Sequence, residues 1–228
     1  MDFGFVGSEP EWQRIKPQFD AQSAHRLVAL LLDSPSATGA AIEPGVQPHA
    51  WPASVRKVSD FEELLTDPHV SALILGGASD ARAERLRRIA QHGRSCLCLP
   101  AAESDAILLH EVAMIAAESH GVLVPWLPAR LHPAWQDILS RSAPDALGVA
   151  QSVLIERTGP MPTGRQLVAM SYAEAADMLG SLVGEVTEIT ATGVLAAGRL
   201  VVQHRTATGQ AGEIRLAPAA SDPDRWRI

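Results

Sequence analysis

FGFVG, at residues 3–7, is a short apolar run that ends in glycine, and it predicts a buried first strand. Four more apolar runs of strand length follow in the first half of the chain, at residues 25–33, 70–77, 95–100 and 122–126. Stretches between them have helical periodicity or helix-end signals, at residues 59–67, 80–93 and 104–121. Strands that alternate with helices in this way predict an α/β fold, with a doubly wound parallel sheet and helices on both of its faces.

The second half of the chain has a different pattern, which is rich in strands. Helices are expected over residues 132–142 and 163–185, and strands at residues 147–159, 185–197, 199–209 and 211–219. These elements predict a mostly antiparallel sheet in a smaller α+β domain. The sequence therefore predicts two domains, a Rossmann-type, dinucleotide-binding-like domain at residues 1–124 and a sheet domain at residues 125–228.

Composition narrows the class of protein. The chain has 228 residues, of which 46% are hydrophobic, and a formal net charge of −7. That length and apolar content predict a folded protein, and the acidic charge makes nucleic acid an unexpected partner. No apolar run is long enough to span a bilayer and the first residues lack a basic, signal-like segment, so no membrane association is expected.

The two cysteines, Cys96 and Cys98, lie two residues apart in a predicted strand. They point to the same face but lie too far apart for easy disulfide formation, so we interpret them as small buried side chains. The histidines lack the spacing typical of metal ligands, so no metal site is expected. Free cysteines are typical of a reducing compartment, and the expected location is cytoplasmic.

The order of these elements, together with three local stretches, resembles the Gfo/Idh/MocA family of nicotinamide-dependent oxidoreductases. The stretches are FEELLTDPHVSALIL at residues 61–75, ARLHPAWQDIL at residues 129–139 and LGVAQSVLI at residues 147–155. The resemblance covers most of the chain, although the sheet domain is shorter than is usual in the family. It implies hydride transfer between NAD or NADP and a sugar, cyclitol or related polyol, and self-association through the open face of the C-terminal sheet.

The turn after the first strand is where such a fold binds the pyrophosphate of the cofactor, and it needs three spaced glycines. Here the turn is GSEPEW at residues 7–12, in which only Gly7 matches the motif. Glu9 stands at the second glycine position and Trp12 at the third. Carboxylates repel a pyrophosphate and suit a helix N-terminus that binds no anion, so we expect weak or absent cofactor binding.

Besides Gly7, the residues implied to contact NAD or NADP are Ser8, Asp33 and Gly76. Asp33 ends the second predicted strand, where an acidic side chain about 20 residues after the turn accepts hydrogen bonds from the adenosine ribose. The distance along this chain is somewhat longer. A turn or helix-cap carboxylate in the Asp-Ser-Pro sequence is an equally open interpretation of Asp33.

The catalytic positions of the family are not matched. Its lysine, which precedes a proline after the fourth strand, corresponds to Leu99, and leucine transfers no proton. Its aspartate and histidine, four residues apart on a helix, correspond to Met170 and Glu174 when the register is anchored on LVGE at residues 182–185. Asp177 matches a further acidic residue one helical turn later.

The remaining candidates for the substrate cleft are Arg130 and His132, beside Glu174 and Asp177. Arg130 is suited to bidentate binding of a carboxylate or phosphate, or it packs on a tryptophan at the domain junction. His132 precedes a proline and is more typical of a turn or helix start.

Two interpretations of polar helix residues also stay open. Glu174 and Tyr172 form an acid/base pair if Tyr172 turns inward, and otherwise they are ordinary polar positions on a helix. The arginines of the helix at residues 80–93 are interpreted as a solvated face, and they are Arg82, Arg85, Arg87 and Arg88.

The combined losses favour a catalytically degenerate homologue that acts as a ligand-binding or partner subunit. Its expected partners are a small molecule, a second copy joined through an apolar face of the C-terminal sheet, or a related active subunit. The alternative is an active NAD(P)-dependent oxidoreductase with a non-standard site, because fold alone does not decide activity.

Overall fold

The structure is a computed structural model of the whole chain. It describes residues 1–20, 24–33, 51–76, 81–101, 106–142, 148, 150–162, 164, 167–219 and 225–228. The chain divides into two compact units, Met1–Trp126 and Leu127–Ile228. Within the described ranges, no helix is long and apolar enough to cross a membrane.

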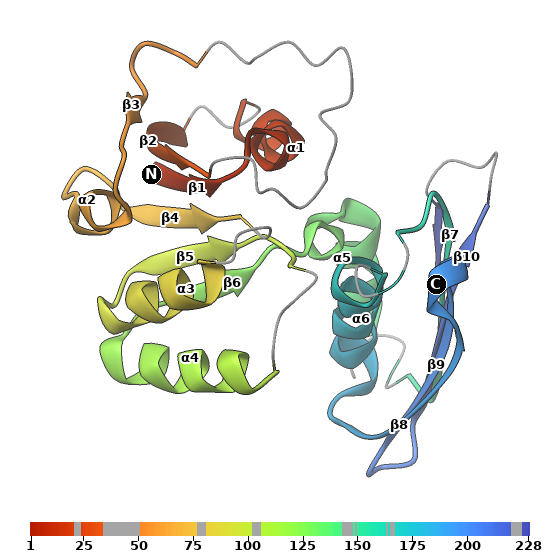
Figure 1. Cartoon of the computed structure of the whole chain (residues 1–228). Helices are drawn as coiled ribbons and strands as arrows, with labels where there is room; N and C mark the ends of the chain where they lie inside the picture. The colour runs from red at the N-terminus through yellow and green to blue at the C-terminus, as the bar shows by residue number, and fades with distance from the viewer. Residues whose placement is uncertain are drawn as a thin grey trace. The chain divides into compact units, whose positions relative to one another are not determined.

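The first unit contains a six-stranded sheet in the order β3-β2-β1-β4-β5-β6, and all neighbouring strands are parallel (Figure 1). The strands are β1 (Asp2–Gly7), β2 (Arg26–Leu32), β3 (Arg56–Lys57), β4 (Ala72–Leu75), β5 (Ser95–Cys98) and β6 (Leu123–Pro125). The predicted doubly wound parallel sheet is therefore confirmed. Strand β3 was not predicted, because a two-residue strand of Arg56 and Lys57 carries no hydrophobic pattern.

Helices cover both faces of this sheet. Helix α1 (Glu9–Asp20) packs Trp12 and Ile15 against one face, where Phe5 and Ile74 are fully buried. The other face carries α2 (Phe61–Thr66), α3 (Arg82–Gln91) and α4 (Ala106–Ser119), whose apolar side chains join Val6, Leu73 and Leu75 in a second core. The carboxyl ends of β1, β2 and β4 thus meet at one edge, where a fold of this type binds its ligands.

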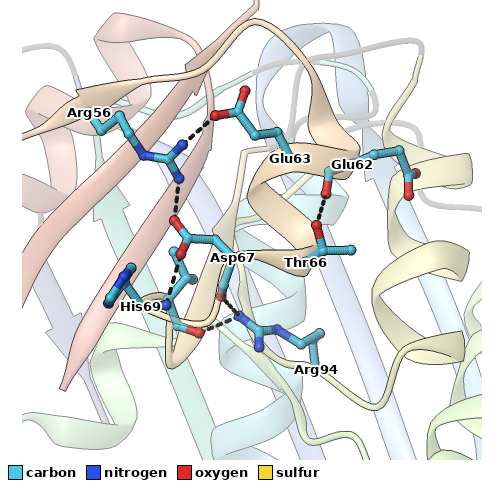
Figure 2. A network of polar contacts seen from close by, with 8 residues as sticks. Arg56, Glu62, Glu63, Thr66, Asp67, His69 and Arg94 are labelled. Carbon is cyan, nitrogen blue, oxygen red and sulfur yellow. Dashed lines mark hydrogen bonds and ion pairs between the residues drawn. The ribbon is translucent and has the colours of Figure 1, made fainter.

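A buried carboxylate fixes the end of α2 to the strands beside it (Figure 2). Asp67 is 7% exposed, accepts a hydrogen bond from the His69 N–H at 2.8 Å and pairs with Arg56, which also pairs with Glu63. Arg94 donates to the carbonyl oxygens of Asp67 and Val70 from the start of the β5 region. Burial by itself raises the pKa of Asp67, but the His69 N–H and the Arg56 guanidinium lower it below its usual value.

The second unit is a five-stranded sheet in the order β11-β7-β10-β9-β8, with helices on one face (Figure 1). Its strands are β7 (Ser152–Gly159), β8 (Val186–Val194), β9 (Arg199–Thr206), β10 (Ala211–Pro218) and β11 (Arg225–Arg227). Only the β7–β10 pair is parallel, so the predicted mostly antiparallel sheet is confirmed. The helices are η1 (Pro128–Leu131), α5 (Pro133–Arg141), η2 (Leu167–Tyr172), α6 (Ala173–Val183) and η3 (Leu195–Ala197).

The face of this sheet that points away from the helices is polar, which corrects the expectation of an exposed apolar face. Its residues alternate with the buried row that contains Ile155, Val202 and Ile214. Charged side chains on it form ion pairs between strands, such as Arg215 with Glu156 at 3.4 Å. The apolar runs in β7 and β9 misled the prediction because Leu154 and Val201 are isolated among these charges rather than part of a patch.

Candidate functional site

The turn between β1 and α1 is closed by a side chain of the helix itself. Glu11 Oε2 accepts hydrogen bonds from both the backbone N–H and the hydroxyl of Ser8, each at 2.9 Å. The first helical hydrogen bond runs from the Trp12 N–H to the Ser8 carbonyl at 3.2 Å. Ser8 is therefore the N-cap residue and Glu11 the third residue of the helix, and the bond from the Ser8 N–H to the Glu11 side chain is one half of a capping box.

The Glu11 carboxylate lies over the two glycines that were predicted to contact the cofactor. A Cβ atom built on Gly76 would stand 2.5 Å from Glu11 Oε2, and one built on Gly7 would stand 2.9 Å from it. Glu11 is only 9% exposed. Since the pyrophosphate of a dinucleotide needs this space and these N–H donors, the residues present do not fit NAD or NADP at this turn.

Trp12 occupies the position where the third glycine lets a helix approach the sheet. It is 4% exposed and packs its ring against Phe5, with 5.3 Å between ring centroids, and near Trp51 at 5.8 Å. An indole in this layer is a core side chain, so this departure from the motif is compensated by packing.

Asp33, at the end of β2, pairs with an arginine of α3. Its Oδ1 lies 2.7 Å from Arg85 Nη1, and both side chains are mostly buried. A depression of about 510 Å³ opens beside this pair, with Phe61, Glu62 and Arg88 among its lining residues. Asp33 therefore has the position predicted for ribose binding, but its carboxylate already has a cationic partner.

Arg82 and Arg85 correct the interpretation of the α3 arginines as a solvated face. Arg82 donates to the carbonyl oxygens of Leu75, Gly76 and Leu99, the last at 2.8 Å. Burial lowers the pKa of Arg82 from its usual value. The Arg82 guanidinium therefore lies at the carboxyl ends of β4 and β5 and binds carbonyl oxygens there, which is a structural role. Leu99 itself is 5% exposed and belongs to the core beneath α1.

Glu174, on α6, is a buried anchor. It is 8% exposed, and its Oε1 accepts the Ala129 N–H of η1 at 2.7 Å while Oε2 lies 3.8 Å from Arg157 Nη1. Met170 lies four residues earlier in the chain, in η2. The Glu174 carboxylate thus joins a helix, a turn and strand β7, and this arrangement ties both of its oxygens to other groups.

Arg130 and Asp177 form a bidentate pair, with both nitrogen–oxygen distances at 2.5 Å. Arg130 therefore has its own carboxylate partner rather than either of the partners considered from the sequence. His132 caps α5, because its Nδ1 accepts the Ala134 N–H at 3.2 Å. The interpretation of His132 as a helix-start residue is confirmed.

Tyr172 turns toward the sheet rather than toward Glu174. Its hydroxyl lies 2.9 Å from His204 Nε2, and the two rings are stacked with centroids 5.9 Å apart. Burial raises the pKa of Tyr172 and lowers the pKa of His204, which is 4% exposed. In the described part of the chain, His204 Nδ1 finds no hydrogen-bond partner. Of the two interpretations left open, the acid/base pair of Glu174 and Tyr172 is therefore not formed, because Tyr172 pairs with His204 instead.

Two of these features had a signal in the sequence, and two had none. The Ser-x-x-Glu pattern of Ser8 and Glu11 is the standard mark of a capping box, but the glycine motif drew attention to Glu9 instead. In β9, alternation already places His204 on the same face as Val202. Arg82 and Glu174 take partners 17 and 45 residues away, which no local pattern reveals. No group of three or more metal-ligating side chains occurs among the described residues.

Comparison with known proteins shows which solved structures share this fold. No family model and no curated protein matches the chain. Solved structures do match it, among them a UDP-N-acetylglucosamine 3-dehydrogenase from Acidithiobacillus ferrooxidans, with a TM-score of 0.75 at 18% identity over 100% of this chain and 73% of that one. A myo-inositol dehydrogenase from Corynebacterium glutamicum has a TM-score of 0.74 at 16% identity, covering 99% of this chain and 71% of its own.

A third similar structure, GenD2 from gentamicin A biosynthesis, was solved in complex with NAD. Its TM-score is 0.73 at 16% identity, covering 99% of this chain and 67% of that one. The TM-scores establish a shared fold, and the coverage of this chain shows that the likeness extends through both units. The chain therefore has the fold of the dehydrogenases of the Gfo/Idh/MocA type.

Proposed function

We propose that this protein keeps the dehydrogenase fold without hydride transfer, and that it works as a ligand-binding or partner subunit. The observation that carries the proposal is the Glu11 carboxylate, which takes both Ser8 donors at the turn where a dinucleotide would need them. A bound pyrophosphate would have to displace a buried carboxylate of the same charge, which costs binding free energy.

The second unit supports the same proposal. Glu174, which corresponds to the family's histidine, is held by Ala129 and Arg157, and Leu99 replaces the family's lysine with a core side chain. A general base must reach the proton that it removes, and it contributes roughly 10²–10⁴-fold to a rate. The loss of pyrophosphate donors and the loss of acid/base groups affect different steps, so neither offsets the other.

Titration with NADH and NADPH tests the proposal, followed by nicotinamide fluorescence and by thermal unfolding. A ligand present at 100 times its Kd adds about 2.7 kcal/mol to stability. In a protein of this size, each kcal/mol raises Tm by roughly 2–4 °C. We expect no saturable fluorescence change and no shift of Tm for the wild-type chain. Micromolar binding by the wild-type chain would overturn the proposal.

Matched variants show whether Glu11 is the obstacle. Glu11→Ala removes the carboxylate over Gly7 and Gly76, whereas Glu9→Ala removes a charge from the same helical turn without opening that space. We expect Glu11→Ala to bind either cofactor more tightly than Glu9→Ala does. Equal binding by the two variants would mean that general repulsion, and not occupation of the turn, excludes the cofactor.

An active NAD(P)-dependent oxidoreductase with a non-standard site is the second candidate. It is favoured by Asp33, which stands at the end of β2 beside an open depression of about 510 Å³. Turnover across a panel of sugars and cyclitols, with Glu174→Gln as the site variant, tests it. Turnover by the wild-type chain would establish catalysis and replace the first proposal, and its loss in Glu174→Gln counts for the site only where circular dichroism shows that the variant is folded.

A further inference from the structure

Strand β8 is the edge of the second sheet and is exposed along its length. It pairs with β9 on one side, and it is the last strand in the sheet order. Eight of its nine residues, Val186–Val194, are exposed. A strand edge carries a row of backbone N–H and C=O groups that can pair with another strand. Proteins protect such an edge with charged residues, proline or a β-bulge. Strand β8 contains neither lysine nor proline, and its one charged residue, Glu188, and its register shift lie near its start, so residues 189–194 carry none of these features.

One apolar side chain of β8 is exposed on the side of the sheet that the helices cover elsewhere. Ile189 pairs in register with His204, and Ala191 with Val202, so both lie on the side of the buried core. His204 and Val202 are nearly inaccessible, yet Ile189 is 59% exposed. The helical layer therefore ends before the edge strand and leaves an apolar position beside a backbone that, among the described residues, pairs with β9 alone.

The sequence of β8 complements itself in the antiparallel direction. If two copies pair about an axis at Thr190, residues 188–192 are matched without crossing the register shift between Val186 and Glu188, and Ile189 faces Ala191 on the core side. On the other side Glu188 faces Thr192, so no like charges stand opposite one another. The register centred on Glu188 instead places two carboxylates together, and that register is disfavoured.

We propose that two copies of this chain associate by antiparallel pairing of their β8 strands, which continues one five-stranded sheet into the other. Main-chain hydrogen bonds along the strand supply most of the attraction, as in other cases of strand addition. Ile189 of each copy then packs beside Ala191 of the other and leaves water. The polar outer faces of the two sheets stay exposed, because they carry ion pairs rather than an apolar patch.

Light scattering on the full chain over a range of concentrations gives the first test. We expect a dimer for the wild-type chain and a monomer for Ile189→Lys, since the added charge lies at the pairing edge. The matched control is Ile107→Lys, which changes an isoleucine that is 77% exposed on α4. The control should dimerise as the wild-type chain does, and circular dichroism checks that both variants fold. A wild-type monomer at high micromolar concentration overturns the proposal.

Cysteine crosslinking separates edge pairing from stacking of the sheet faces. Thr190→Cys places a thiol at the proposed axis, and mild oxidation should join two copies. Arg205→Cys places a thiol one strand inward, on the exposed outer face, where edge pairing keeps the two copies apart. Crosslinking through Thr190→Cys alone, above the wild-type background, supports the proposal. Crosslinking through Arg205→Cys alone would instead indicate stacked faces and would refute it, and so would the absence of crosslinking in both variants.

Discussion

Glu174, which the resemblance places in the catalytic site, has a structural task in this fold. Its carboxylate accepts the Ala129 N–H and faces Arg157, while the neighbouring Tyr172 points the other way and meets His204. A buried charge with two partners is costly to remove, because the partners lose a group that they cannot replace. The Glu174 side chain therefore serves to hold η1 against α6.

Glu174→Gln is expected to destabilise the protein by about 1–3 kcal/mol, because it removes the charge that the Ala129 N–H and Arg157 share. Urea unfolding at pH 7 measures the change. Asp177→Asn is the control on the same helix. It breaks the more exposed pair with Arg130, which is 53% exposed at its side chain, and it should cost less, about 0–1 kcal/mol. A smaller effect of Glu174→Gln than of Asp177→Asn would contradict the anchoring role.

At the scale of elements, the start of α1 is the part of the first unit that differs most from a dinucleotide-binding turn. In a fold that binds a dinucleotide, the first helix leaves its N–H groups for the ligand. Here the Glu11 carboxylate accepts the Ser8 N–H and hydroxyl within the chain, and Trp12 fixes the helix to β1 through Phe5. The start of the helix thus has a side-chain cap from within the chain, and its stability should depend on this cap.

Glu11→Ala is expected to lower the stability of the protein by about 0.5–2 kcal/mol, the usual range for the loss of a helix cap. Chemical unfolding followed by circular dichroism measures it. Glu9→Ala removes a similar charge from the first turn but not the hydrogen bonds to Ser8, so the difference between the variants isolates the cap. If Glu9→Ala costs as much as Glu11→Ala, the interaction with the helix dipole suffices and the capping box contributes little.

At the scale of the whole molecule, two buried groups in different units make stability depend on pH in the same direction. Burial lowers the pKa of His204, so the unfolded chain binds a proton below about pH 6.5 that the folded chain does not yet bind. The pKa of Asp67 is lowered by its partners despite burial, so protonation in the unfolded chain, from about pH 3.9 downward, precedes protonation in the folded one.

Stability should therefore fall as the pH falls, first below about 6.5 and again below about 3.9. Urea unfolding at a series of pH values gives the curve. His204→Gln is expected to flatten its upper part and Asp67→Asn its lower part, each without changing the other. His110→Gln, on the exposed side of α4, is the control and should leave the upper slope in place. An unchanged slope in both test variants would contradict the assignment.

Much of the architecture followed from local pattern. The run FGFVG, the apolar strands after it and the helices between them predicted the parallel sheet, because alternation and period depend on residues close together in the chain. The same is true of the strand-rich second half and of the cap at His132. Strand β3 was not predicted, because two polar residues are too few to show a hydrophobic periodicity.

The sequence by itself therefore determined the fold class, and it shows Glu9, Trp12 and Leu99 where the resemblance implies two glycines and a lysine. Only the tertiary structure decided what the replacing residues do. In the tertiary structure, Tyr172 points toward His204, and Glu174 binds a partner 45 residues away. Strand β8 is the last strand in the order of the second sheet. The physical reason is that hydrogen bonds and burial depend on which distant segments pack together, whereas a pattern of neighbours reports only the face on which each side chain lies.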